Sequence, residues 1–210
     1  MSVHSRMLAD RRHQGMTLVE VLLTLSIFII IVVAVGTFQV NVFSYHKAVY
    51  GSLQTSQDAQ IILKTILREV RSMSPGATGQ YPISVAATNT LTFFSDLDGN
   101  NVQDQITYSL IGNTIYRARI VPSGSPATYL AANQGTTTLV TNIRNSSSTP
   151  VFEYYDDTFT GTSTPLSQPV TVTAVKLIKV NLTLDVDPNR SPLPIMYSAD
   201  VNLRNLKTNL

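Results

Sequence analysis

The sequence predicts an α+β protein with a pilin-like fold, in which one long N-terminal helix packs on an antiparallel β-sheet domain. Three observations predict it. Residues 21–45 form an uninterrupted uncharged run, and residues 46–73 contain no proline while keeping apolar residues at helical spacing. After Pro75 the pattern changes to short runs of alternating, β-branched residues that are typical of strands.

The uncharged run of residues 21–45 is long enough to cross a bilayer, which needs about 20 residues. The preceding residues 1–15 form a short basic leader with Arg6, Arg11 and Arg12. Such a charge bias predicts that the leader stays in the cytoplasm and that the rest of the chain lies outside the cytoplasmic membrane. A secretory signal peptide, cleaved after small residues close to Gly36, is an alternative that the sequence leaves open.

The helix is expected to continue beyond the membrane, from Met16 to Met73. We assign residues 16–45 to a transmembrane segment and residues 46–74 to an amphipathic continuation, whose polar side would include Glu69. Its apolar stripe consists of Val49, Leu53, Ile62, Leu63, Ile66, Val70 and Met73.

Residues 75–210 are predicted to form the extracytoplasmic β-sheet domain. Gly112-Asn113 lies between two strand-like runs and predicts a tight hairpin turn. Residues 122–136 and 156–169 are rich in Ser, Thr, Gly and Pro and predict loops. The expected strands are 90–95, 105–111, 114–121, 137–143, 151–155, 170–184 and 195–204.

The composition excludes most catalytic designs. The chain has no cysteine, and its three histidines are His4, His13 and His46. Residues 47–210 therefore cannot build a Ser-His-Asp triad, a Cys-His pair or a histidine-ligated metal site. Hydrolysis by a pair of carboxylates remains formally possible. We nevertheless expect that the protein is not an enzyme. The leader carries the whole net charge of +2, so the remainder has no basic excess that would predict a nucleic-acid partner.

The residues Gly15-Met16-Thr17-Leu18-Val19-Glu20, placed between a basic leader and an apolar helix, resemble the class III signal sequence of type IV pilins and type II secretion pseudopilins. The resemblance implies that a prepilin peptidase cuts between Gly15 and Met16 and methylates the new N-terminus. Looser similarity in residues 93–117, 152–156 and 200–205 points to minor pilins of the J-pseudopilin or PilW-like kind.

Glu20 is the acidic residue of this motif. It lies about 6 Å along the helix axis from Met16, since each residue rises about 1.5 Å. A carboxylate close to lipid is costly unless it is paired. Pairing with the cationic terminus of its own chain or of a neighbour would set the register of helices in a filament. The alternative is a carboxylate that reaches the membrane boundary.

The resemblance implies a structural subunit of a type IV pilus or a type II secretion pseudopilus. Its partners would be the prepilin peptidase, other pilins in a mixed filament, an inner-membrane assembly platform and, before assembly, membrane lipid. Nucleic acid would be a partner only if the filament serves DNA uptake. The alternative function is a membrane-tethered or secreted β domain that binds or adheres to a surface, with an ordinary signal anchor.

An acidic loop follows the first predicted strand. Asp96, Asp98, Asn100 and Asp104 occupy positions 1, 3, 5 and 9 of an EF-hand-like pattern, and the carbonyl of Val102 falls at position 7. This spacing predicts a calcium site. The pattern lacks the glycine at position 6 and the glutamate at position 12, where Asn101 and Thr107 stand. A plain polar turn is the alternative.

Overall fold

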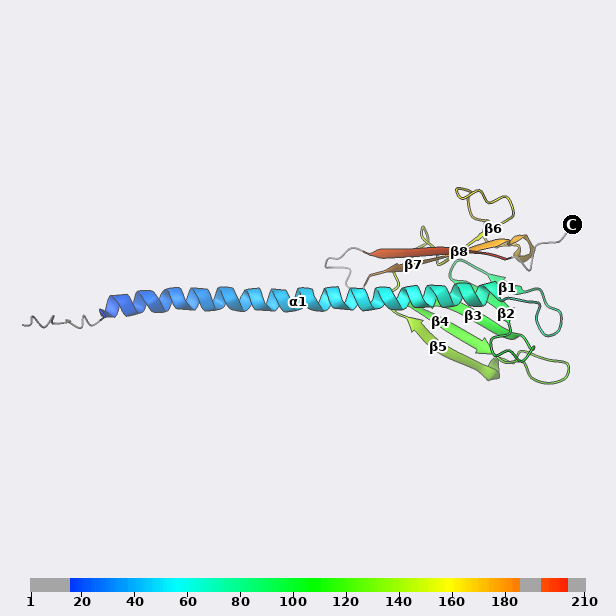
Figure 1. The fold of residues 1–210 in the computed structure, drawn as a ribbon, viewed down its shortest axis with the longest axis horizontal. Coiled ribbons are helices and arrows are strands. Elements are labelled where there is room, and N and C mark those ends of the chain that lie inside the picture. Colours follow the sequence, from blue (N-terminus) through cyan, green and yellow to red (C-terminus); the bar gives the residue numbers. More distant parts are fainter. Residues whose placement is uncertain (1–15, 186–193, 204–210) are drawn as a thin grey trace, which may run out of the picture. The chain divides into compact units, whose positions relative to one another are not determined.

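The computed structural model describes residues 16–185 and 194–203, and the contacts within it divide the chain into two compact units, residues 1–46 and residues 47–210. Helix α1 runs through both units, and the strands belong to the second. The elements are α1 (Leu18–Arg71), β1 (Ile83–Ala86), β2 (Thr90–Ser95), β3 (Asp104–Ile111), β4 (Thr114–Ile120), β5 (Gln134–Val140), β6 (Phe152–Tyr155), β7 (Leu177–Leu184) and β8 (Ile195–Asn202) (Figure 1).

In the first unit, the described chain is the apolar part of α1. The stretch Leu18–His46 is long and apolar enough to cross a membrane, although a signal sequence near an N-terminus would meet the same criteria. Its side chains are exposed on nearly every side of the helix. A helix that is apolar all round needs an apolar environment, which lipid or neighbouring apolar helices provide.

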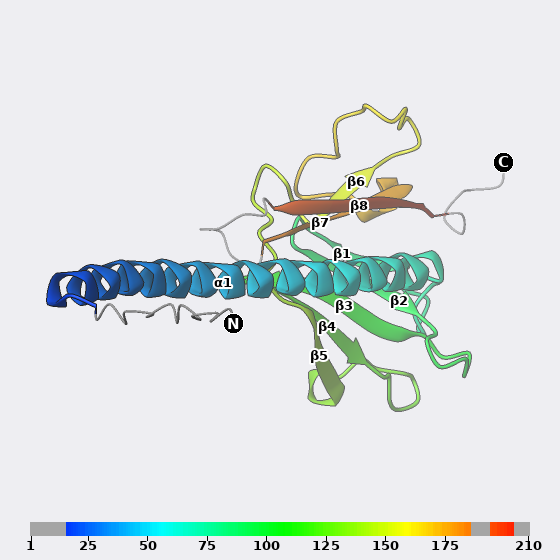
Figure 2. The same ribbon diagram turned by 60° about the vertical axis from the view of Figure 1, so that its left-hand side comes forward.

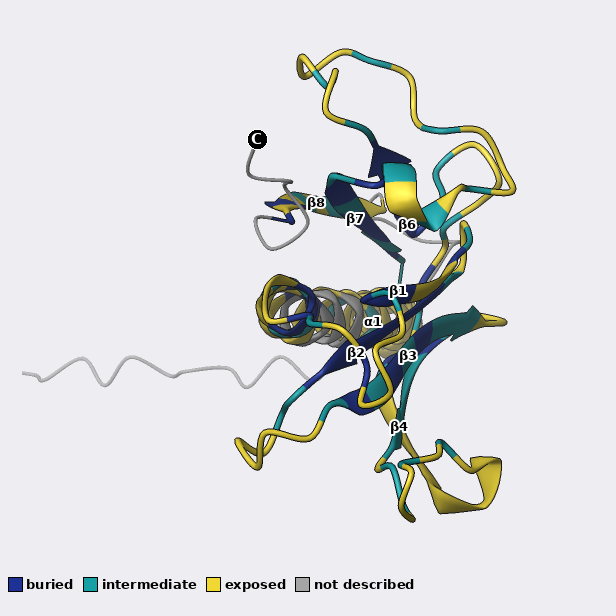
Figure 3. Ribbon diagram, turned by 90° about the vertical axis from the view of Figure 1, so that its right-hand side faces the viewer, coloured by how far each residue is buried: buried dark blue, intermediate teal, exposed yellow. Residues whose placement is uncertain are grey.

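In the second unit, the strands form two antiparallel sheets. One sheet has the order β1-β2-β3-β4-β5, and the other has the order β6-β7-β8. The part of α1 that belongs to this unit lies between them (Figures 1 and 3). The turned view in Figure 2 again places the two sheets on different sides of this part of α1. Both sheets and the helix therefore contribute to one hydrophobic core.

The helix reaches this core through residues at spacings of three and four. Leu63, Ile66, Val70 and Met73 are buried, as the apolar stripe predicts, and Ala59, which the prediction did not include, is buried as well. Val49 is 45% exposed, which corrects its predicted place in the stripe, and the side chain of Leu53 lies outside the described residues. Burying each large aliphatic side chain stabilises the fold by about 1.5–3 kcal/mol. Immediately after the helix, the Ser74 N–H donates to the Phe94 carbonyl at 3.0 Å, so the chain continues as a partner of β2.

The structure confirms the α+β class and several of its predicted elements. Helix α1 begins and ends within two residues of the predicted bounds. The hairpin between β3 and β4 turns at Gly112, which has a φ of 60°. Glycine adopts a positive φ without strain because it has no Cβ that would clash with the backbone.

Other details differ from the prediction. The strands divide into two sheets, and the short strand β1 was not predicted. Strand β5 begins at Gln134 instead of residue 137, and β7 begins at Leu177 because residues 172–174 form a 3₁₀ turn instead of extending the strand. Val175 is nevertheless fully buried, so the apolar pattern before β7 reports core packing and not strand pairing.

Candidate functional site

The N-terminal motif forms the start of α1. The Thr17 side-chain oxygen accepts a hydrogen bond from the Glu20 backbone N–H at 3.3 Å, and the Val21 N–H donates to the Thr17 carbonyl at 3.1 Å. Thr17 thus caps the helix, and Thr17-x-x-Glu20 has the sequence of a capping box. This role was not predicted, although the spacing of a threonine and a glutamate before an apolar run was the available signal.

The predicted processing residues lie at this end of the chain. Met16 is 62% exposed, and Glu20 is exposed on the first turn of the helix. Gly15 lies outside the described residues. An acidic side chain in the first turn is favourable because the helix dipole is positive there. Within the described chain, the Glu20 carboxylate has no ion-pair or hydrogen-bond partner.

Four hydroxyl side chains inside the apolar stretch are satisfied by their own helix. The hydroxyls of Thr24, Ser26, Thr37 and Ser44 each donate to a backbone carbonyl three or four residues earlier, at 2.7–3.1 Å. A hydroxyl without a partner would be costly in lipid, and these internal bonds remove that cost. These hydroxyl groups are therefore compatible with lipid and with close packing against other helices.

The acidic loop between β2 and β3 is organised by Asp96. Its carboxylate accepts backbone N–H bonds from Gly99, Asn100 and Asn101 at 2.8–3.2 Å. Desolvation acts to raise the pKa of the Asp96 carboxyl, but these hydrogen bonds outweigh it and leave the pKa below its usual value. Asn101 has a φ of 62°, which asparagine tolerates. Asp96 is thus occupied with closing the turn.

The other two acidic residues of the loop share an arginine from β4. The Arg119 Nε donates to Asp104 Oδ2 at 2.7 Å, and its Nη2 lies 2.6 Å from both Asp104 Oδ2 and Asp98 Oδ2. The Asp104 side chain is 0% exposed, and its Oδ1 has no hydrogen-bond partner among the described residues. Burial raises the pKa of the Asp104 carboxyl despite the attraction of Arg119.

The side chains that were predicted to bind calcium each have other partners in the structure. Asn100 Oδ1 accepts the Val102 N–H at 2.7 Å, and Arg119 supplies the positive charge between Asp98 and Asp104. In the part of the chain that the structure describes, no group of three or more His, Cys, Asp or Glu side chains could hold a metal ion. An ion at this loop would have to replace Arg119 as the partner of two carboxylates.

Calcium binding at this loop stays a prediction, and calorimetric titration of residues 46–210 would test it. If calcium binds, we expect weak affinity, with a Kd of roughly 10⁻⁴–10⁻³ M as in extracellular modules, because the ion competes with Arg119. Asp98→Asn should then abolish the heat. An absence of both heat and a shift in thermal unfolding at millimolar calcium would leave the plain polar turn as the explanation.

A second polar cluster holds α1 against the five-stranded sheet. Glu69 is only 5% exposed, which corrects its predicted place on the polar side of the helix. The Tyr108 hydroxyl donates to Glu69 Oε2 at 2.5 Å, and Arg117 Nη2 lies 3.1 Å from Glu69 Oε1. Burial, followed by the Glu69 charge, raises the pKa of Tyr108. These contacts fix the rotation of the helix relative to β3 and β4 within the second unit.

We expect residues 46–210 to lose stability as the pH rises above about 10. Burial raises the pKa of Tyr108 and Tyr154, and that of Tyr155 to about 12, whereas unfolded tyrosine has a pKa of 10.0. The unfolded chain then releases protons that the folded chain retains, so alkaline conditions favour unfolding. Urea unfolding at several pH values would measure this loss. In the Tyr108→Phe variant, the free energy of unfolding should fall less steeply with pH. An unchanged dependence on pH would show that Tyr108 does not cause the loss.

Comparison with known proteins concerns the N-terminal motif. Residues 10–36 match the family described as the prokaryotic N-terminal methylation motif. No curated protein matches the chain. The match includes Met16, Glu20 and the first part of the apolar helix, and it supports a subunit of the pilin or pseudopilin type.

Proposed function

We propose that this chain is a minor pilin or pseudopilin, a structural subunit of a type IV pilus or of a type II secretion pseudopilus. The observation that carries the proposal is the methylation motif at residues 10–36, which leads directly into a helix with an exposed apolar surface. Proteins with this motif are structural subunits. The lack of cysteine, and of histidine beyond His46, is consistent with a structural role.

The proposed mechanism begins in the cytoplasmic membrane. The leader lies inside, the apolar part of α1 spans the lipid, and the prepilin peptidase cuts after Gly15. The new Met16 amine is methylated and remains cationic, so Glu20 has a partner on its own chain or on the preceding subunit. In the low dielectric of a helix bundle, this pairing favours one axial register over its neighbours.

Assembly then exchanges lipid for protein around the apolar part of α1. An inner-membrane platform would bring other pilins to it, and the exposed side chains of this stretch would pack against their helices. Internally bonded hydroxyls add no unpaired polar groups to such an interface. The sheets of the second unit would form the outer part of the filament, in the periplasm or at the cell surface.

Mass spectrometry of the mature N-terminus tests the proposal. We expect a chain that begins at Met16 and carries one added methyl group. Gly15→Val should leave the leader attached, because a side chain at this position would crowd the peptidase groove. A mature terminus near Thr37 would instead indicate an ordinary signal peptide and a secreted binding module. An unprocessed wild-type chain in cells with an active prepilin peptidase would also contradict the proposal.

A further inference from the structure

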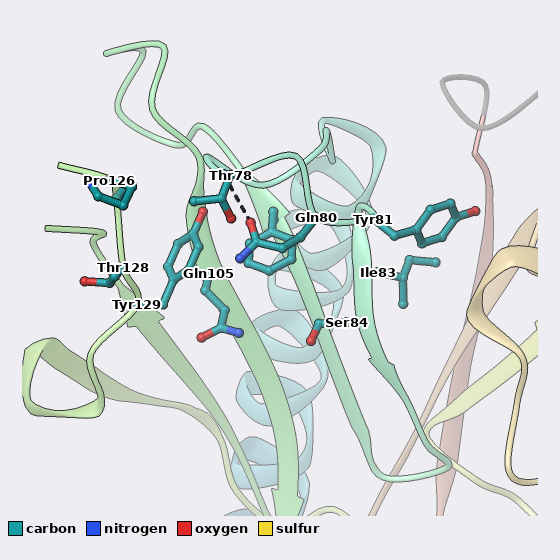
Figure 4. Close-up of a pocket in the computed structure, with 11 residues that line it drawn as sticks. Thr78, Gln80, Tyr81, Ile83, Ser84, Gln105, Pro126, Thr128 and Tyr129 are labelled. Carbon is teal, nitrogen blue, oxygen red and sulfur yellow. Dashed lines mark hydrogen bonds between the residues drawn. The ribbon is translucent and has the colours of Figure 1, made fainter. Parts of the chain in front are cut away.

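A cavity of about 680 Å³ opens at one end of the five-stranded sheet (Figure 4). Its floor is formed by β1, β2 and β3, and its two walls are the loop after α1 and the loop before β5. The volume falls within the range of roughly 300–1,000 Å³ that is typical of small-ligand sites. Its lining includes Thr78, Ser84, Phe94, Gln105 and Tyr129.

The aromatic wall of the cavity is held in place. The Tyr129 hydroxyl accepts the Ala77 backbone N–H at 3.0 Å and donates to the Gln103 carbonyl at 2.8 Å. Its ring packs against Phe94 with 5.0 Å between ring centroids. Figure 4 shows this ring between the two loops, beside Gln80 and Gln105. Because both ends of the side chain are fixed, the ring is a preorganised apolar surface.

Three polar side chains of the cavity are free to bind a ligand. The Gln105 side-chain amide and the hydroxyls of Thr78 and Ser84 have no hydrogen-bond partner within the described residues. They come from three separate elements and line one space. Amides and hydroxyls can each donate and accept, so they suit ligands that carry several hydroxyl groups.

Charge narrows the class of ligand further. The cavity lining contains no Asp, Glu, Lys, Arg or His. An anionic ligand would lose its hydration without gaining an opposite charge, and a nucleic acid would find no cation for its phosphates. A neutral ligand with one apolar face and several hydroxyl groups satisfies the aromatic wall and the free polar groups together.

We propose that this cavity is a binding site for a neutral saccharide. A sugar ring would place its C–H face against Tyr129, and its hydroxyls would bond Gln105, Ser84 and Thr78. All of these residues belong to the second unit, so the proposal does not depend on filament assembly or on processing at Gly15.

The test uses the full chain in a detergent without a sugar headgroup. The probes are neutral oligosaccharides (lactose, cellobiose and chitotriose) and sialyllactose as an acidic counterpart, and binding is measured by saturation-transfer NMR and by titration. We expect at least one neutral probe to bind with a Kd in the millimolar range or below. Gln105→Leu should weaken that binding about tenfold, since one lost hydrogen bond with an unpaired partner changes affinity by about that factor.

Two further variants separate binding from folding. Ser84→Ala removes one hydroxyl from an exposed strand position and should weaken binding several-fold without changing the thermal unfolding temperature. Gln134→Leu, the same change as at residue 105 but on β5 and outside the cavity, should bind as the wild type does. The proposal is overturned if no neutral probe binds, if sialyllactose alone binds, or if Gln105→Leu and Ser84→Ala bind a neutral probe as the wild type does.

Discussion

Glu20→Ala is expected to insert into the membrane normally and to be almost absent from assembled filaments. Insertion depends on the apolar stretch of α1, which the substitution leaves unchanged. Filament incorporation depends on the carboxylate, because each misregistered helix would leave a terminal amine without its partner in an apolar bundle. The expected result is a normal amount of chain in the membrane fraction and a near-complete loss from sheared filaments.

The controls separate the charge of Glu20 from its place in the helix cap. Glu20→Gln keeps the shape of the side chain but removes its charge, so it should be lost from filaments as Glu20→Ala is. Thr17→Ala removes the hydroxyl that accepts the Glu20 N–H but keeps the carboxylate, so it should assemble nearly normally. Normal incorporation of Glu20→Ala would contradict the register mechanism. If Thr17→Ala is lost from filaments to a similar degree, the assembly defect arises from the disturbed start of the helix and not from the missing charge.

The long helix was predictable because its signals are local. The uncharged run and the apolar residues at helical spacing each lie within one continuous stretch of sequence. Both patterns can therefore be recognised without knowing which distant residues are in contact. The division of the strands into two sheets was not predictable in this way. It depends on which strands pair, and β1 is too short to show a clear alternation. Strand β5 is exposed over Gln134–Thr138, so its first residues carry no buried face to mark them.

The candidate site shows the same contrast. The core of the methylation motif, Gly15 to Glu20, is six consecutive residues, so the sequence alone was enough to predict it. The partner of Asp104 lies on another strand, and the two residues meet because the hairpin at Gly112-Asn113 places Ile106 opposite Arg119. Counting residues outward from the predicted turn would have brought an arginine close to the acidic loop. The burial of Glu69 depends on Tyr108 and Arg117, which no local pattern connects to the helix.

Arg119→Ala is expected to lower the free energy of unfolding of residues 46–210 by about 3–5 kcal/mol, the usual cost of leaving a buried charge without its partner. Asp104 is fully buried, and its carboxylate has hydrogen bonds only from Arg119 among the described residues. Urea unfolding would measure the change. Asp98→Asn is the matched comparison: Asp98 is more exposed and loses only a surface pair with Arg119, so its cost should be below about 1 kcal/mol.

The pH dependence of the Arg119→Ala variant identifies the buried carboxylate as the cause. Without Arg119, the folded-state pKa of Asp104 should rise further, because burial already raises it and the opposing attraction is gone. The folded variant then binds a proton more readily than the unfolded chain, so its deficit should shrink as the pH falls through that pKa. Replacing Arg119 and Asp104 together by leucine should restore much of the stability, since a buried ion pair contributes little more than apolar packing of similar volume. A deficit that is independent of pH, or that persists in the double variant, would mean that Arg119 stabilises β4 through its packing and not through its charge.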